Sequence, residues 1–201
     1  MVNFFSSKFK LGILGGGQLG KMMLYDTRKF DIQTHVLDPS AEAPARLACD
    51  HFKQGDLMDF ETVLSFGRQV DVLSFEIESV NVQALETLEK EGVKVYPSSS
   101  TLNRIQNKAV QKNFYKDHEL PTAAFEVFAS KTELYSALEE SRIELPFVWK
   151  SATGGYDGKG VSVIRTQGDL KELSEGQCIA EKLIPFKNEL AVIVARNVSG
   201  E

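Results

Sequence analysis

Short apolar runs alternate with helical patterns along the first half of the chain. Buried strands are predicted at 10–14, 32–38, 51–55, 70–76 and 93–97, and helices at 18–27, 60–68 and 81–90. Strand–helix–strand alternation with links this short favours parallel pairing, because a parallel crossover uses a helix to return the chain. The pattern therefore predicts an α/β fold that begins with a doubly wound parallel sheet.

The pattern changes in the second half. A polar helical stretch opens at Ser98 and runs to about His118, in a position to bridge two domains. Strands are predicted beyond it at 124–128, 145–150, 161–165, 178–184 and 189–197, with one helix after Ser130 and a short one over 168–173. Ser130 and Glu133 form a capping-box pattern, in which the glutamate reaches back to the first amide. This half predicts a small antiparallel sheet with two helices.

Composition narrows the class of protein. The chain has 201 residues, 42% of them hydrophobic and 25% charged, with a formal net charge of -5. An acidic chain with interspersed charges lacks the basic footprint of a nucleic-acid binder. The apolar run 190–195 is far shorter than the roughly 20 residues that span a bilayer. No signal-peptide pattern opens the chain, and we expect a soluble, cytoplasmic protein that binds neither nucleic acid nor membrane.

A glycine motif follows the first strand. Gly15, Gly17 and Gly20 in LGILGGGQLGKMM fit G-x-G-x-x-G, and Asp38 ends the next strand about 20 residues later, where a dinucleotide enzyme carries its ribose-binding acid. The geometry is more general, since a helix N-terminus with free amides suits any phosphate-bearing ligand. An NAD-dependent oxidoreductase is one alternative here, although residues 121–201 show no catalytic dyad for it.

A second glycine loop, SATGGYDGKG (151–160), lies between two predicted strands. Its glycines let backbone amides approach an anion, and Lys159 adds a mobile charge. It is not a Walker loop, because Thr153 replaces the first glycine and Gly160 follows the lysine. The plain alternative is a flexible hairpin tip.

The flanks of this loop favour a nucleotide site. Lys150 ends the entering strand, where its ammonium can reach phosphates as a point charge. Downstream, EKLIPFKNE (181–189) combines a strand end with a proline break, which offers backbone groups to an adenine edge. Glu189 can accept ribose hydroxyls, as acidic residues do in other nucleotide folds.

These stretches carry a resemblance. The chain resembles the ATP-grasp superfamily, in particular the N5-carboxyaminoimidazole ribonucleotide synthases of bacterial purine biosynthesis. The similar stretches are 15–23, 70–80, 92–98, 107–114 with 120–122, 154–160 and 181–196, in the family's order. The resemblance implies a Rossmann-like pre-ATP-grasp domain over 1–106, a linker helix and α+β ATP-grasp lid over 107–182, and the start of a truncated third domain over 183–201.

The resemblance also implies how ATP is held. Lys108 and Lys150 contact the phosphates, and the loop from Gly155 to Lys159 closes over the γ-phosphate. Segment 181–184 holds adenine and Glu189 the ribose. The implied ATP-binding residues are Lys108, Lys150, Gly155, Gly158, Glu181, Lys182, Leu183, Ile184 and Glu189.

The implied reaction phosphorylates bicarbonate with ATP and carboxylates the amine of aminoimidazole ribonucleotide. The implied ribonucleotide contacts are Gly17, Gln18, Leu19 and Glu76, and the implied catalytic residues are Tyr156, Asp157 and Lys159. Without the resemblance, a strand-end glutamate such as Glu76 is about as well explained as a helix cap or a surface ion pair.

The chain departs from the family pattern in places. Lys108 stands where arginine is common, residues 151–153 lack an arginine that usually precedes the loop, and Val161 replaces a frequent glutamine. The Mg²⁺ ligands of the family are expected beyond Glu201, so we expect this chain alone not to turn over ATP and the full-length protein to form a homodimer. Another ATP-grasp ligase with a different nucleophile, or a binding module without activity, remain alternatives.

Overall fold

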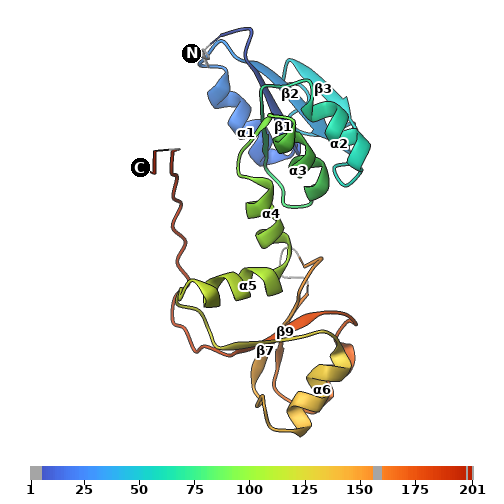
Figure 1. The fold of residues 1–201 in the computed structure, drawn as a ribbon, viewed down its shortest axis with the longest axis vertical. Coiled ribbons are helices and arrows are strands. Elements are labelled where there is room, and N and C mark those ends of the chain that lie inside the picture. Colours follow the sequence, from blue (N-terminus) through green and yellow to red (C-terminus); the bar gives the residue numbers. More distant parts are fainter. Residues whose placement is uncertain (1–5, 156–159, 198, 201) are drawn as a thin grey trace. The chain divides into compact units, whose positions relative to one another are not determined.

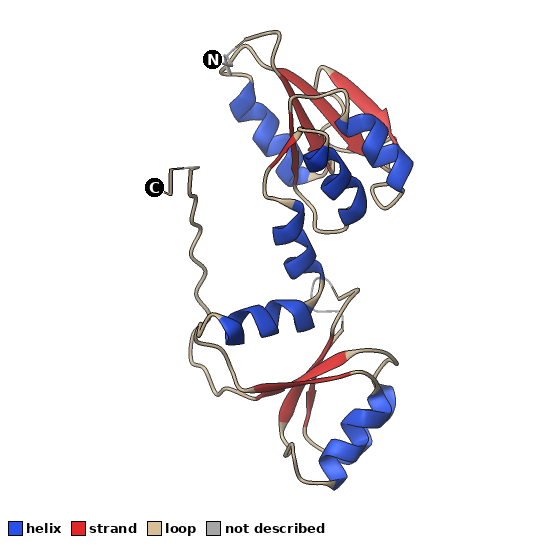
Figure 2. Cartoon of the chain, viewed as in Figure 1, coloured by secondary structure: helices blue, strands red, loops and turns tan. Residues whose placement is uncertain are grey.

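The computed structural model describes residues 6–155, 160–197, 199 and 200. The chain forms two compact units, Met1–Asp117 and His118–Glu201 (Figure 1). The first contains a parallel sheet and the second an antiparallel one, which confirms the predicted fold class (Figure 2). The domain boundaries at 106/107 and 182/183 stay predictions.

The first unit is built on a five-stranded sheet in the order β3-β2-β1-β4-β5. The strands are β1 Lys10–Leu14, β2 Gln33–Asp38, β3 His51–Gln54, β4 Val72–Phe75 and β5 Lys94–Val95, all pairing in parallel. The central strand β1 pairs with β2 on one side and β4 on the other. The strand order therefore reverses at β1, which makes its carboxyl end the topological switch point of the sheet.

Helices cover both faces of this sheet (Figure 1). They are α1 Gln18–Thr27, α2 Phe60–Gly67 and α3 Val82–Lys90. Leu24 of α1 packs with Ile13 and Val36 on one face, whereas α2 and α3 pack on the other with Leu14 and Leu73. Apolar positions at helical spacing produce this burial on both faces, as the doubly wound arrangement requires.

The polar helical stretch that opens at Ser98 consists of two helices. Helix α4 spans Ser99–Gln106 and α5 spans Lys108–Asp117. Asn107 between them is extended, with φ -121° and ψ 106°, and its Oδ1 accepts hydrogen bonds from the amides of Ala109 and Val110. The stretch is helical as predicted, and Asn107 divides it because its side chain caps a new helix instead of continuing the old one.

The second unit contains a four-stranded sheet in the order β6-β9-β7-β8. Its elements are β6 Phe125–Phe128, α6 Lys131–Glu139, β7 Phe147–Ser151, β8 Val161–Ile164, the 3-10 helix η1 Gln167–Glu172 and β9 Cys178–Lys182. All of its strand pairs are antiparallel, as predicted. Phe128, Trp149 and Ala180 form one core with α6 and η1 on a single face of the sheet.

The cap of α6 is partly as predicted. Ser130 accepts a hydrogen bond from the amide of Glu133, as a capping serine does. The Glu133 carboxylate reaches back one residue further than expected, to the amide of Ala129 at 2.7 Å rather than to that of Ser130. The helix start is fixed from both sides all the same.

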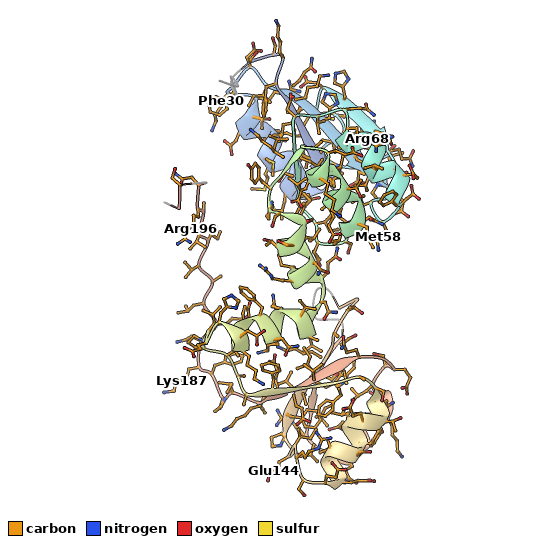
Figure 3. All side chains as sticks on the ribbon, in the orientation of Figure 1. Phe30, Met58, Arg68, Glu144, Lys187 and Arg196 are labelled. Atoms are coloured by element: carbon orange, nitrogen blue, oxygen red, sulfur yellow. The ribbon has the colours of Figure 1, made fainter. Side chains whose placement is uncertain are left out.

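Segment 189–197 is not a strand, so that prediction was wrong. Its residues are irregular, and Leu190, Val192 and Ile193 are 89%, 82% and 99% exposed. Figure 3 shows its side chains projecting from an extended chain between the labelled Lys187 and Arg196. Apolar β-branched residues favour a strand only where another strand pairs with them, and no other described segment pairs with this one.

A glycine at the end of α2 tests the packing of the first unit. A Cβ on Gly67 would lie 2.2 Å from Cδ1 of Leu88, which is fully buried. We expect Gly67→Ala to lower the free energy of unfolding by about 1–3 kcal/mol through overpacking. In an open helix the same change stabilises by about 1 kcal/mol. Urea denaturation followed by circular dichroism measures the difference.

Gly168→Ala is the matched control, because the nearest atom to its added Cβ is Oγ1 of Thr166 at 3.5 Å. We expect stability there to stay unchanged or to rise by up to about 1 kcal/mol. A stabilised Gly67→Ala protein would contradict the packing described.

Candidate functional site

The glycine turn after β1 is held by the two strands beside it. The amide of Gly15, at φ +96°, donates to the carbonyl of Leu37 at 2.9 Å. The amide of Gly16 donates to Oδ2 of Asp38 at 2.6 Å. The amide of Gly17, the residue that caps α1, donates to Oε1 of Glu76 at 2.8 Å. Three successive amides of the turn therefore have acceptors within the protein.

This arrangement corrects the expectation of free amides at the turn. In a dinucleotide site such amides bind the pyrophosphate, but here two carboxylates already occupy those of Gly16 and Gly17. Asp38 is also bound on its other oxygen by the amide of Ser40 at 2.7 Å. The acid that suggested a ribose contact thus anchors the turn. Its position at the end of the strand next to β1 supported the dinucleotide alternative, and the structure gives that carboxylate a structural partner instead.

The predicted ribonucleotide residues meet at this edge of the sheet. Gln18 and Leu19 begin α1 directly after Gly17, with their side chains exposed, and Leu19 is 62% exposed. Glu76 follows the last residue of β4 and touches Gly17. The four residues Gly17, Gln18, Leu19 and Glu76 therefore gather at the switch point, where open α/β sheets bind their ligands.

Lys108 occupies the first residue of α5 and is partly buried. The first turn of a helix carries a partial positive charge, so a lysine there does not stabilise the helix, but its charge adds to that of the helix in attracting an anion. The side chain of Asn107 satisfies the amides of Ala109 and Val110 in the same turn. This position fits a phosphate contact.

In the second unit, a lysine and a glutamate form an ion pair on one face of the sheet. Nζ of Lys150 in β7 lies 2.7 Å from Oε2 of Glu181 in the adjacent strand β9. Only 7% of Glu181 is exposed. Strand register places Phe125, Val148 and Ile179 on the same face, opposite to α6. The sheet thus presents an apolar face with one charged pair in it.

The second glycine loop leaves the end of β7 next to this pair. The amide of Ser151 donates to the carbonyl of Gly160 at 2.8 Å and closes the neck of the loop. Gly154 and Gly160 have φ of +74° and +72°, which other residues rarely adopt. Gly155 lies in the neck, because a Cβ on Gly160 would approach its Cα to 3.3 Å. The predicted residues Tyr156, Asp157, Gly158 and Lys159 lie outside the described residues.

The opposite end of the same strands borders a cavity of about 1010 Å³. Its lining includes the predicted adenine segment, namely Glu181, Lys182, Leu183 and Ile184, together with Phe125, Phe147 and Phe186. Because β7 begins at Phe147 and ends at Ser151, the cavity and the glycine loop lie at its two ends with Lys150 and Glu181 along the way.

Glu189 is not brought to this cavity. It lies on the exposed irregular segment after β9, beyond the last lining residue Phe186.

No group of three or more metal-ligating side chains occurs among the described residues. No described helix is long and apolar enough to cross a bilayer.

Comparisons with known proteins follow the same division. Residues 8–106 match the ribonucleotide synthetase preATP-grasp domain, and residues 113–201 match the ATP-grasp domain. The chain belongs to the ATP-grasp superfamily. This places the glycine turn and Glu76 in the first domain, and Lys150 and Glu181 in the second.

Several of the similar proteins are named N5-carboxyaminoimidazole ribonucleotide synthases. The chain is 34% identical over 195 residues to that of Bacillus subtilis, covering 95% of this chain and 50% of the relative. The Thermotoga maritima synthetase structure has a TM-score of 0.86 at 36% identity, covering 96% and 51%. An Aspergillus clavatus synthase in complex with ADP and 5-aminoimidazole ribonucleotide has a TM-score of 0.80 at 31% identity, covering 92% and 48%. The chain spans about half the length of these relatives.

The ion pair of Lys150 and Glu181 gives a prediction of stability. Lys150→Met leaves a buried carboxylate without its ammonium, and we expect the free energy of unfolding to fall by about 2 kcal/mol. The loss is smaller than for a fully buried pair because 28% of the Lys150 side chain is exposed. The double variant Lys150→Met/Glu181→Leu should recover most of this, since an apolar pair suits the apolar face.

Chemical denaturation of both variants and of Glu140→Gln measures the effect. Glu140 pairs with Arg142 at 2.9 Å and its side chain is 61% exposed, so that control should change stability by at most about 0.5 kcal/mol. A double variant that is less stable than Lys150→Met would show that the pair is not the source of the loss.

Proposed function

We propose that the protein to which this chain belongs carboxylates 5-aminoimidazole ribonucleotide with bicarbonate at the expense of ATP, in purine biosynthesis. The product is N5-carboxyaminoimidazole ribonucleotide, with ADP and phosphate. The observation that carries the proposal is the pairing of Lys150 with Glu181 between a glycine loop and a cavity, in a chain whose first unit gathers Gln18, Leu19 and Glu76 at a switch point. The similarity to a synthase in complex with ADP and 5-aminoimidazole ribonucleotide supports it.

The first unit supplies the ribonucleotide contacts in this proposal. Gln18 and Leu19 present exposed side chains beside the turn, and the Glu76 carboxylate is fixed by the amide of Gly17. A fixed carboxylate can accept hydrogen bonds from a substrate amine and orient it for attack. Glu76 can play this role while it binds Gly17, because the Gly17 amide donates to Oε1 and the substrate amine would donate to Oε2.

The second unit supplies the ATP contacts. The cavity receives the base at segment 181–184, and Lys150 neutralises phosphate charge. Lys108, which belongs to the first unit, is a further phosphate contact in this proposal. Loop residues 155–159 close over the γ-phosphate, where Tyr156, Asp157 and Lys159 act. Mg²⁺ bound with ATP supplies further charge neutralisation at the phosphates. We place its ligands outside the described residues.

The chemistry needs no protein nucleophile. A bicarbonate oxygen attacks the γ-phosphorus, the bond to ADP breaks, and carboxyphosphate forms. The substrate amine then attacks the carboxyl carbon, phosphate leaves and the amine loses a proton. Phosphoryl transfer of this kind depends on positioning and charge neutralisation, and a closed loop protects the labile mixed anhydride from water.

We further propose that the full-length protein is a cytoplasmic homodimer.

The ribonucleotide site is testable on the 201-residue chain. We expect 5-aminoimidazole ribonucleotide to raise the melting temperature of the chain, because a ligand that binds the folded state stabilises it, and NADH to leave it unchanged. Gln18→Ala should weaken ribonucleotide binding about tenfold through loss of a ligand hydrogen bond without changing the ligand-free melting temperature. Isothermal titration calorimetry and thermal shift measure the two effects.

Met22→Ala is the matched control. Met22 lies in the same helix and is 59% exposed, so it should change neither stability nor affinity. Stabilisation by NADH in place of the ribonucleotide would overturn the proposal in favour of a dinucleotide enzyme. Equal affinities in Gln18→Ala and the unaltered chain would remove Gln18 from the site.

A further inference from the structure

A glutamine at the end of α4 holds the loop that carries Glu76. Nε2 of Gln106 donates to the carbonyl of Glu78 at 2.6 Å and to that of Val80 at 2.7 Å. Gln106 is the last residue of α4, far along the chain from the loop it contacts. A side chain thus joins two separate segments of the first unit through main-chain carbonyls.

The loop over 76–80 is anchored at both ends. It begins where the amide of Glu76 donates to the carbonyl of Leu14 at 3.1 Å. It ends at Val80, which is fully buried, and at Asn81, whose amide donates to the carbonyl of Leu57. Between these ends, the Val80 amide donates to the Glu78 carbonyl and Gln106 makes its two hydrogen bonds.

The chemistry of this contact selects glutamine over glutamate. A primary amide carries two N–H donors, and here each meets one carbonyl. A carboxylate of the same size would place an acceptor against two acceptors. Because both partners are carbonyl oxygens, the orientation of the Gln106 amide is fixed by them.

We propose that Gln106 is a positioning residue that holds the Glu76 loop in place, so that the Glu76 carboxylate stays on the amide of Gly17. The chain continues from Gln106 through the cap residue Asn107 into Lys108, the first residue of α5. The contact therefore ties the loop of the ribonucleotide site to the start of the helix that carries a phosphate contact. Its consequence for ribonucleotide affinity rests on the proposed function, whereas its consequence for the loop does not.

The test is Gln106→Glu in the full chain, read by amide hydrogen exchange and by binding of 5-aminoimidazole ribonucleotide. We expect the amides of Gly17 and Val80 to exchange about tenfold faster or more, because two hydrogen bonds become a repulsion. The amide of Gly15, which is bound to Leu37 on the other side of β1, should keep its protection. Ribonucleotide affinity should fall by a similar factor.

Gln69→Glu is the matched control. Nε2 of Gln69 donates to the carbonyl of Ser65 at 2.8 Å, after α2 and away from the loop. It introduces the same charge against a carbonyl and should leave Gly17 and Val80 unchanged. Equal loss of protection at Gly15 and Gly17 in Gln106→Glu would show a general loss of stability and overturn the positioning role. Unchanged exchange at the amides of Gly17 and Val80 would also overturn it.

The two levels of the proposal fail separately. If the unaltered chain does not bind the ribonucleotide but Gln106→Glu frees the amide of Gly17, the proposed function fails and the positioning of Glu76 stands. If the unaltered chain binds and the variant binds equally well with an unchanged Gly17 amide, the positioning role is wrong and the proposed function stands.

Discussion

The fold of the first unit depends on one constraint at the glycine turn after β1. Three successive backbone amides there, those of Gly15, Gly16 and Gly17, need hydrogen-bond acceptors. Where β1 ends at the topological switch point, the amides of the next residues lie between the ends of its two neighbouring strands. Buried amides without hydrogen-bond partners lower stability. Here the carbonyl of Leu37 and the carboxylate of Asp38 come from the end of β2, and that of Glu76 comes just after β4. The turn is therefore built from both sides of the sheet, and the start of α1 follows from it.

This constraint changes what the glycines do. In a dinucleotide fold, glycines after the first strand let a pyrophosphate approach the amides. In this chain a Cβ on Gly17 would lie 2.8 Å from Oε1 of Glu76, and one on Gly20 would lie 2.8 Å from the carbonyl of Gly15. The glycines admit the protein's own groups to the turn. A pyrophosphate at this edge would meet the Glu76 carboxylate instead of free amides.

Much of the fold follows from local pattern, and the exceptions have local or long-range causes. The predicted helix 18–27 coincides with α1 because apolar spacing and the glycine turn agree there. The break at Asn107 depends on whether an asparagine side chain caps or is solvated, which spacing does not decide. The ion pair of Lys150 and Glu181 and the role of Gln106 depend on contacts between distant segments. Residue type identified Lys150 as a candidate, but only strand register sets it beside Glu181.

Segment 189–197 separates propensity from structure. Its continuous apolar run contains Val192, Ile193 and Val194, residue types typical of a strand, yet Val192 and Val194 are 82% and 84% exposed. The strands of the second unit form because β9 lies between β6 and β7 and bonds to both. A β-strand makes its backbone hydrogen bonds only to neighbouring strands. An apolar run is therefore a strand in β9, which has two neighbours, and irregular after it, where no described strand pairs with it. Pairing, rather than composition, therefore decides which apolar runs of this chain become strands.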